Sequence, residues 1–177
     1  YVAEGSGRVV AFDVVSGDVA WIHQRNYPDD IRLSQALNRH RGVSVYGDNI
    51  YWGTADSYLV ALDARTGTQV WEVSTGDYTT GIGHNHPPLI ADDKVILGFT
   101  GGDRNARGAI AAYDPEDGEL IWKTYTVPAP GEPGSETWAG GALETAGGAN
   151  VWTGMALDET RGILFAPTGS TTPDFYG

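Results

Sequence analysis

Two histidines stand close together in the middle of the chain. His84 and His86 are separated by one residue, so on a strand both rings would share a face and could bind a transition metal. Pro87 and Pro88 follow directly and favour a loop, in which the rings would instead form the polar rim of a pocket. The chain has no cysteine, which excludes disulfides, thiolate zinc sites and cysteine catalysis.

Other candidate residues lie in three short segments. Arg41 follows Asn38-Arg39-His40, Asp103 ends the glycine-rich run Gly98–Asp103, and Trp152 stands alone after Asn150. Each has a plain structural alternative: an exposed loop charge for Arg41, the cap of a turn for Asp103, and a packing aromatic for Trp152. The choice between a structural and a chemical role depends on the fold that positions these side chains.

The fold is indicated by a repeat, A-x-D-x-x-[ST]-G-x-x-x-W. Its three copies span Ala11–Trp21, Ala61–Trp71 and Ala112–Trp122, so their tryptophans are 50 and 51 residues apart. Repeats of about 40 to 50 residues built from short strands are typical of propeller blades.

The repeated residues have clear structural roles. In each copy the aspartate can accept backbone N–H bonds across a turn, and the glycine can adopt a positive φ. The tryptophan can bury ~200 Å² against a neighbouring blade. These residues are Asp13, Asp63 and Asp114; Gly17, Gly67 and Gly118; and Trp21, Trp71 and Trp122.

We therefore predict an all-β fold: a β-propeller segment of about three four-stranded antiparallel blades. A propeller closes with about four to eight blades, and the chain does not begin with Met, so we interpret it as a piece of a longer chain. The expected units are a half blade at 7–24, full blades at 43–74 and 86–125, and a half blade at 150–168.

Two long connections, 25–42 and 126–150, interrupt the pattern. Loops of this length in a compact repeat are usually functional or binding segments. The second contains Glu132, Glu136 and Trp138. Surface solvation is the simple interpretation of all three, and a pocket wall is the alternative for Trp138.

The composition of the chain limits the classes of molecule that it is expected to bind. The net charge is −12 and there are only two lysines, which argues against nucleic acid because phosphate binding needs a basic surface. An acidic surface fits a periplasmic or secreted protein. No apolar run approaches the ~18 residues of a membrane span.

The repeat resembles the tryptophan docking motif of pyrroloquinoline quinone (PQQ) dependent dehydrogenases, which are eight-bladed propellers. The third copy departs slightly, with Asp117 at the Ser/Thr position. Non-enzymatic scaffold propellers of bacterial outer-membrane assembly carry a similar repeat. Three further segments favour the dehydrogenases.

The first segment, Asn38–Val43, resembles the family's R-G segment, in which Arg41 matches the arginine that binds the quinone. Alcohol and methanol enzymes place two adjacent cysteines before it, where this chain has Gln35 and Ala36. The disulfide lid over the cofactor is therefore absent, as it is in glucose-type members.

The second segment, Gly98–Asp103, resembles the family's G-x-S-G-A-E loop, with Asp in place of Glu. The resemblance implies that Thr100, Gly101 and Gly102 contact PQQ and that Asp103 binds the metal. Upstream, His86–Leu89 resembles the S-P-P segment of glucose-type enzymes, with His in place of Ser.

The third segment runs from Asn150 to Asp174 and resembles the family's N-x-W strand and the G-N turn that follows. Trp152 matches the tryptophan that forms the floor under the quinone. Ser170 falls where alcohol-type members place a metal-binding Asn. The ending Thr171-Thr172-Pro173-Asp174 resembles glucose and quinate dehydrogenases more than methanol dehydrogenases.

The resemblance implies a dehydrogenase that oxidises sugar, polyol or alcohol hydroxyls by hydride transfer to PQQ. It also implies Ca²⁺ or Mg²⁺ (a lanthanide is an alternative) and a cytochrome c or quinone as electron acceptor. The family's catalytic aspartate would lie beyond Gly177 and an early glutamate of the site before Tyr1, so we expect the segment to need the remainder of its propeller chain and to be inactive alone. The alternative function is a non-enzymatic propeller that acts as a protein-binding scaffold.

Overall fold

The computed structural model describes residues 1–34, 36 and 39–172, and this part of the chain is all-β. Two four-stranded antiparallel sheets form its centre. One comprises β4 (Ser44–Tyr46), β5 (Asn49–Gly53), β6 (Tyr58–Asp63) and β7 (Gln69–Ser74). The other comprises β8 (Leu89–Ala91), β9 (Lys94–Gly98), β10 (Ala109–Tyr113) and β11 (Leu120–Tyr125).

Smaller sheets flank these two. A three-stranded sheet precedes them, made of β1 (Val2–Glu4), β2 (Arg8–Phe12) and β3 (Val19–Gln24). After them come the hairpin β13 (Ala156–Asp158) with β14 (Ile163–Phe165), and the pair β12 (Gly147–Gly148) with β15 (Thr171–Thr172). The expected half blade at 7–24 thus gains a third strand, β1, because Val2–Glu4 pairs with Arg8–Val10.

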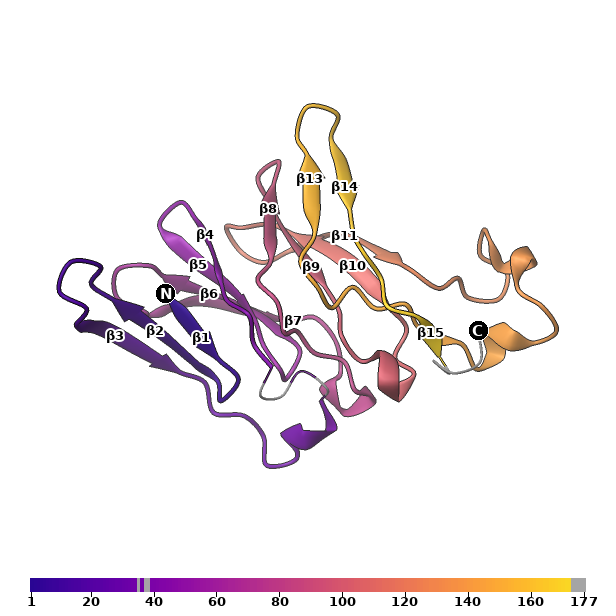
Figure 1. The fold of residues 1–177 in the computed structure, drawn as a ribbon, viewed down its shortest axis with the longest axis horizontal. Coiled ribbons are helices and arrows are strands. Elements are labelled where there is room, and N and C mark those ends of the chain that lie inside the picture. The colour runs from indigo at the N-terminus through magenta and orange to yellow at the C-terminus, as the bar shows by residue number, and fades with distance from the viewer. Residues whose placement is uncertain (35, 37–38, 173–177) are drawn as a thin grey trace.

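The larger sheets lie side by side in chain order, from the N-terminal sheet at one end to the sheet of β8–β11, beside which the β13–β14 hairpin stands (Figure 1). This arrangement and the antiparallel strand order confirm the predicted fold class. Five single-turn 3₁₀ helices occur in the described connections: η1 (Ile31–Leu33), η2 (Tyr78–Thr80), η3 (Gly102–Arg104), η4 (Ser135–Thr137) and η5 (Ala142–Glu144). None of the helices in this part of the chain is long and apolar enough to cross a membrane.

The repeated turns have the predicted chemistry. The Asp13 carboxylate accepts the N–H groups of Val15 and Ser16 at 2.8 and 2.9 Å, and the carboxylates of Asp63 and Asp114 accept equivalent bonds. All three repeat glycines have a positive φ: 80° at Gly17, 71° at Gly67 and 78° at Gly118.

The repeat tryptophans join one sheet to the next. The Trp21 indole N–H donates to the carbonyl of Ala64 (3.1 Å), and the Trp71 indole N–H donates to the carbonyl of Pro115 (3.2 Å). Each tryptophan therefore binds the turn of the following repeat, as a docking role requires. Trp122, on the outer strand β11, is 36% exposed.

Apolar side chains fill the spaces between the sheets. Val9, Trp52 and Leu62 are buried between the first and second sheets. A second cluster, which includes Tyr51, Leu97 and Phe99, lies between the two four-stranded sheets. These cores hold the sheets rigidly and so fix the loops at their ends.

An ion-pair cluster fixes the start of the long connection after β3. The Arg25 guanidinium binds the Asp56 carboxylate, with its Nε 2.9 Å from both oxygens, and the Glu72 carboxylate at 2.6 Å. It also lies over the Tyr58 ring, 4.5 Å from the centroid. Because Asp56 is only 4% exposed, this cluster anchors the loop that leads to Arg39 and Arg41.

Candidate functional site

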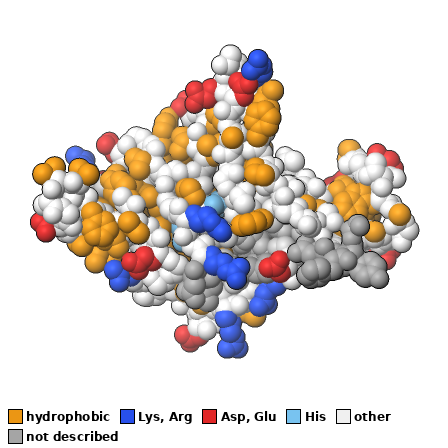
Figure 2. Space-filling view, viewed as in Figure 1, with side chains coloured by type: hydrophobic (Ala, Val, Ile, Leu, Met, Phe, Trp, Pro, Cys, Tyr) orange, Lys and Arg blue, Asp and Glu red, His pale blue; other side chains and the backbone are white. Residues whose placement is uncertain are grey.

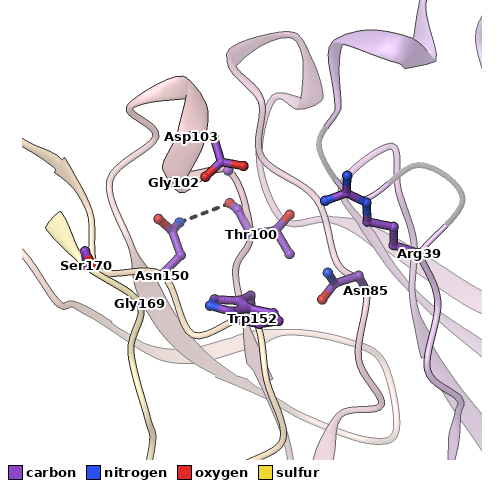
Figure 3. A pocket seen from close by; sticks show the side chains of 10 residues that line it. Arg39, Asn85, Thr100, Gly102, Asp103, Asn150, Trp152, Gly169 and Ser170 are labelled. Atoms are coloured by element: carbon purple, nitrogen blue, oxygen red, sulfur yellow. Dashed lines mark hydrogen bonds between the residues drawn. The ribbon is translucent and has the colours of Figure 1, made fainter. Parts of the chain in front are cut away.

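One pocket collects most of the candidate residues. It has a volume of about 400 Å³, within the ~300–1,000 Å³ range of small-molecule sites. Its walls come from five connections that are far apart in sequence (Figure 3). They comprise Arg39, Asn85, Thr100, Gly101, Gly102, Asp103, Asn150, Trp152, Gly169 and Ser170.

Trp152 lies flat at the base of the pocket in Figure 3. It is 43% exposed, unlike a packing aromatic of the core. Gly169 lies against the indole: a Cβ added to it would come within 3.2 Å of the Trp152 Nε1 atom. The indole therefore offers a broad flat surface with restricted freedom, which suits stacking against a planar ligand.

Arg41 and Asn85 both contact this tryptophan. The Arg41 guanidinium lies 5.4 Å from the centroid of the Trp152 ring. In the amide orientation that satisfies both of its ends, Asn85 donates to the Trp152 carbonyl (3.0 Å) and accepts from Arg41 Nη1 (3.1 Å). Arg41 thus contacts the edge of the site, although it is not among the residues that line the pocket.

Sequence reasoning missed Arg39 and Asn85. Arg39 lines the pocket, and its side chain projects toward it in Figure 3. Asn85 lies between His84 and His86 and is 4% exposed. A cation two residues before Arg41 was the only signal for Arg39, and an amide between two histidines was the only signal for Asn85.

The glycine-rich loop supplies backbone donors. Thr100 donates both its N–H and its hydroxyl to the carbonyl of Gly83, each at 2.9 Å, so its remaining capacity is a hydroxyl lone pair. The N–H groups of Gly101 and Gly102 find no acceptor among the described residues. The loop therefore brings free amide donors to the pocket wall.

Asn150 fixes the loop from the opposite side. Its Nδ2 atom donates to the carbonyl of Thr100 (3.1 Å), which Figure 3 shows as a dashed line. Its Oδ1 atom is buried and has no hydrogen-bond partner in the described structure. A buried amide oxygen beside a pocket is available to a donor or a cation that enters.

Asp103 and Ser170 both lie on the pocket wall and are exposed. Their oxygens are the type of ligand that Ca²⁺ and Mg²⁺ prefer. The described residues contain no cluster of three or more His, Cys, Asp or Glu that could hold a metal ion. Within the described residues, Asp103 and Ser170 alone are too few to form a complete metal site.

His84 and His86 have neither of the roles considered for them. His84 is fully buried, with Nδ1 2.8 Å from the Gly98 carbonyl and Nε2 2.7 Å from the Thr75 hydroxyl. His86 is 1% exposed, and its Nε2 contacts the Val151 carbonyl at 3.2 Å. Burial lowers the pKa of His84 to about 3 and that of His86 to about 4, so both rings are neutral core residues behind the pocket.

Trp138 does not line this pocket. It borders two hollows of the 126–146 connection instead, one with Leu143 and the other with Tyr125. A salt bridge between Arg107 and Glu132 ties this connection to the segment between η3 and β10. The pocket-wall role considered for Trp138 is therefore wrong for the site that contains Trp152.

The pocket residues fit a planar, anionic quinone. Trp152 provides a flat face, Arg39 and Arg41 provide positive charge, and the Gly101 and Gly102 amides provide donors. Gly102 leaves the space that the buried Asn150 oxygen faces, since an added Cβ would lie 2.7 Å from that atom.

Comparison with known proteins gives a consistent result. A family model described as the β-propeller domain of PQQ-dependent glucose, ethanol and alcohol dehydrogenases matches residues 1–177. The quinoprotein alcohol dehydrogenase PedH of Pseudomonas putida is 35% identical over 98% of this chain and 31% of its own length.

Two solved structures are also similar. The quinohemoprotein alcohol dehydrogenase ADHIIG of Pseudomonas putida HK5 superposes with a TM-score of 0.84 and 30% identity, covering 96% of this chain and 28% of that one. A europium-containing methanol dehydrogenase superposes with a TM-score of 0.77 and 26% identity, covering 86% of this chain and 30% of that one. The chain therefore spans about three tenths of the length of these relatives.

These matches correct one expectation. The chain is similar to alcohol and methanol dehydrogenases, and the predicted glucose or quinate type is wrong. That prediction depended on the missing cysteine pair at Gln35 and Ala36, on the His86–Leu89 segment and on the ending Thr171–Asp174. All three are local features, whereas the similarity to alcohol dehydrogenases extends over nearly the whole chain. Gln35 and residues 173–177 lie outside the described part of the structure.

Proposed function

Because the chain belongs to the family of PQQ-dependent glucose, ethanol and alcohol dehydrogenase β-propeller domains, we propose that the whole protein oxidises small alcohols with PQQ as its cofactor. The observation that carries this proposal is the convergence of Trp152, the Gly101 and Gly102 amides and two arginines at one pocket. A scaffold propeller has no need of such a set of donors. When bound, PQQ supplies the two-electron oxidant for an alcohol.

The residues of this chain bind and orient the cofactor. Trp152 stacks under the ring system, and Asn85 fixes its backbone and the Arg41 guanidinium. Arg41 neutralises carboxylate charge, and the free N–H groups of Gly101 and Gly102 donate to ring oxygens. The Trp152 indole at the base of the pocket would shield one face of the bound cofactor from water.

We propose that Asp103 and Ser170 contribute oxygen ligands to a metal ion, Ca²⁺, Mg²⁺ or a lanthanide. A Lewis acid at this end of the pocket polarises a carbonyl oxygen. The europium named for the methanol dehydrogenase relative supports the lanthanide alternative. The remaining ligands and the catalytic base would come from the rest of the propeller.

We further propose that the protein works in the periplasm or is secreted, and passes electrons to a cytochrome c or a quinone. The names of the quinohemoprotein relatives support a haem acceptor. Cell fractionation and reduction of added cytochrome c by the purified protein would test these two points.

The cofactor proposal is tested by titrating the full-length protein with PQQ and Ca²⁺ while tryptophan fluorescence is recorded. We expect quenching, because the indole of Trp152 would stack against a quinone. The variant Trp152→Ala should lose a large part of the quenching, whereas Trp122→Ala, which removes an indole that does not line the pocket, should keep it. Absence of quenching in the full-length protein, or of alcohol-dependent dye reduction after loading, would contradict the proposed function.

A further inference from the structure

Arg39 and Arg41 form a pair of arginines held on either side of an anchored histidine. The His40 ring turns inward: Nε2 contacts the Gly53 carbonyl at 2.7 Å, and Nδ1 accepts the N–H of Gly42 at 3.2 Å. Burial lowers the pKa of His40 and so favours its neutral ring. The anchor places both guanidinium groups next to the pocket.

The two arginines differ in what they contact. Arg41 is engaged by Asn85 and lies over the Trp152 ring. Arg39 lines the pocket itself, and its side chain makes no hydrogen bond or ion pair within the described residues. Several other arginines have acidic partners: Arg25 binds Asp56 and Glu72, and Arg107 binds Glu132.

The negative charge of the ligand and of the protein makes Arg39, an arginine without an acidic partner among the described residues, important at this pocket. PQQ carries three carboxylates, and the chain has a net charge of −12. Asp103 adds a further negative charge on the wall of the same pocket. Lys and Arg side chains gather near the centre of the face shown in Figure 2. Local positive charge is needed to offset the repulsion of a trianion, and one guanidinium can match only one carboxylate in the bidentate geometry.

We propose that Arg39 is a second carboxylate-binding arginine of the cofactor site, with a role distinct from that of Arg41. Arg41 also positions Trp152 through Asn85. Arg39 supplies only its guanidinium, which pairs with a further carboxylate at the pocket wall. This inference rests on the proposed function, because it takes PQQ as the ligand.

The test measures affinity by fluorescence titration of the full-length protein with two probes. PQQ carries the carboxylates, and 9,10-phenanthrenequinone is a flat ortho-quinone without them. Arg39→Gln should weaken PQQ binding about tenfold to a hundredfold, as loss of a charged hydrogen-bonding partner does. It should leave the affinity for phenanthrenequinone unchanged. Arg39→Lys keeps the charge without the fork and should give an intermediate PQQ affinity.

The matched control is Arg65→Gln, which removes the same charge from an exposed turn outside the pocket. It should leave the affinity for PQQ near that of the wild type. Wild-type PQQ affinity in Arg39→Gln would overturn the inference, and so would an equal loss for both probes, because that indicates a structural role. Failure of the wild-type protein to bind PQQ would instead overturn the proposed function.

Discussion

Gly102 lines the pocket and packs so closely against the Asn150 side chain that it leaves no room for a side chain of its own. An added Cβ would lie 2.7 Å from Asn150 Oδ1, closer than real contacts allow. Asn150 cannot move freely, because it is 3% exposed and its Nδ2 atom binds the Thr100 carbonyl.

We therefore expect Gly102→Ala to destabilise the full-length protein by about 1–3 kcal/mol, as overpacking does. It should also weaken PQQ binding, because Asn150 must leave Thr100. In an Asn150→Ala background the same change should be nearly neutral, giving a coupling free energy of about 1 kcal/mol or more. Urea unfolding and PQQ titration measure both effects, and Gly154→Ala, where an added Cβ meets nothing within 4 Å, is the control. Additive effects would contradict the steric explanation.

Side-chain direction explains what sequence reasoning found and missed in the site. Thr100–Asp103, Trp152 and Ser170 were identified by motif position, and all line one pocket. Asn85 was passed over in favour of its histidine neighbours, yet both rings turn into the core and the amide turns to the pocket. A loop has no fixed alternation, so spacing alone does not tell which neighbour faces a ligand.

At the scale of the elements, the repeat turn is both a local turn and a docking surface. A Cβ added to Gly67 would come within 2.5 Å of the Trp21 ring, and one added to Gly118 within 2.8 Å of the Trp71 ring. Glycine is therefore required twice at each position: for the positive φ of the turn and for close contact with the preceding tryptophan. Each of these glycines therefore contributes both to the turn that pairs two strands and to the packing of one sheet against the next.

Gly67→Ala should consequently cost more than a turn glycine normally does. Gly47→Ala in the same sheet is the matched control, since Gly47 also has a positive φ (58°) but an added Cβ meets nothing within 4 Å. We expect about 1 kcal/mol for Gly47→Ala from the left-handed backbone alone. Gly67→Ala should cost about 2–4 kcal/mol, because Trp21 must also shift and lose its bond to Ala64. Equal changes in urea midpoint would show that docking contributes no stability.

The same local chemistry explains how much of the fold the sequence predicted. Aspartate turns, positive-φ glycines and a tryptophan at fixed spacing are short-range signals, and they located both four-stranded sheets. The pair β12–β15 was not predicted, because it joins Gly147–Gly148 to Thr171–Thr172 across the chain. Two-residue strands rich in glycine carry no alternation, so only tertiary contacts specify their register.

At the scale of the whole molecule, two neutral histidines, His84 and His86, are buried in the core next to the site. Their rings contact the carbonyls of Gly98 and Val151, which adjoin the segments that line the pocket. Burial is the main cause of the low pKa values of both rings, and the nearby charges of Arg41 and Lys123 lower them further. These groups link folding to pH in a defined direction.

In the unfolded chain a histidine has a pKa of about 6.5, so it takes up a proton below that pH. In the folded protein His86 and His84 stay neutral until about pH 4 and about pH 3. The unfolded state therefore binds more protons in between, and the free energy of unfolding falls as pH drops from about 6.5 toward 4. The stability contributed by the two neutral rings is fully present above about pH 6.5, where the histidines are neutral in both the folded and the unfolded state.

We expect the urea midpoint of the full-length protein to be lower at about pH 5 than at about pH 7.5. Most carboxylates are ionised at both pH values, so their titration contributes little to the difference. His86→Phe removes one titrating ring and also the contact with the Val151 carbonyl, so the variant should be less stable at about pH 7.5. Its further loss between the two pH values should nevertheless be smaller than that of the wild type, because one fewer proton is taken up on unfolding. A variant with the wild-type pH dependence would show that His86 is not a source of the acid sensitivity.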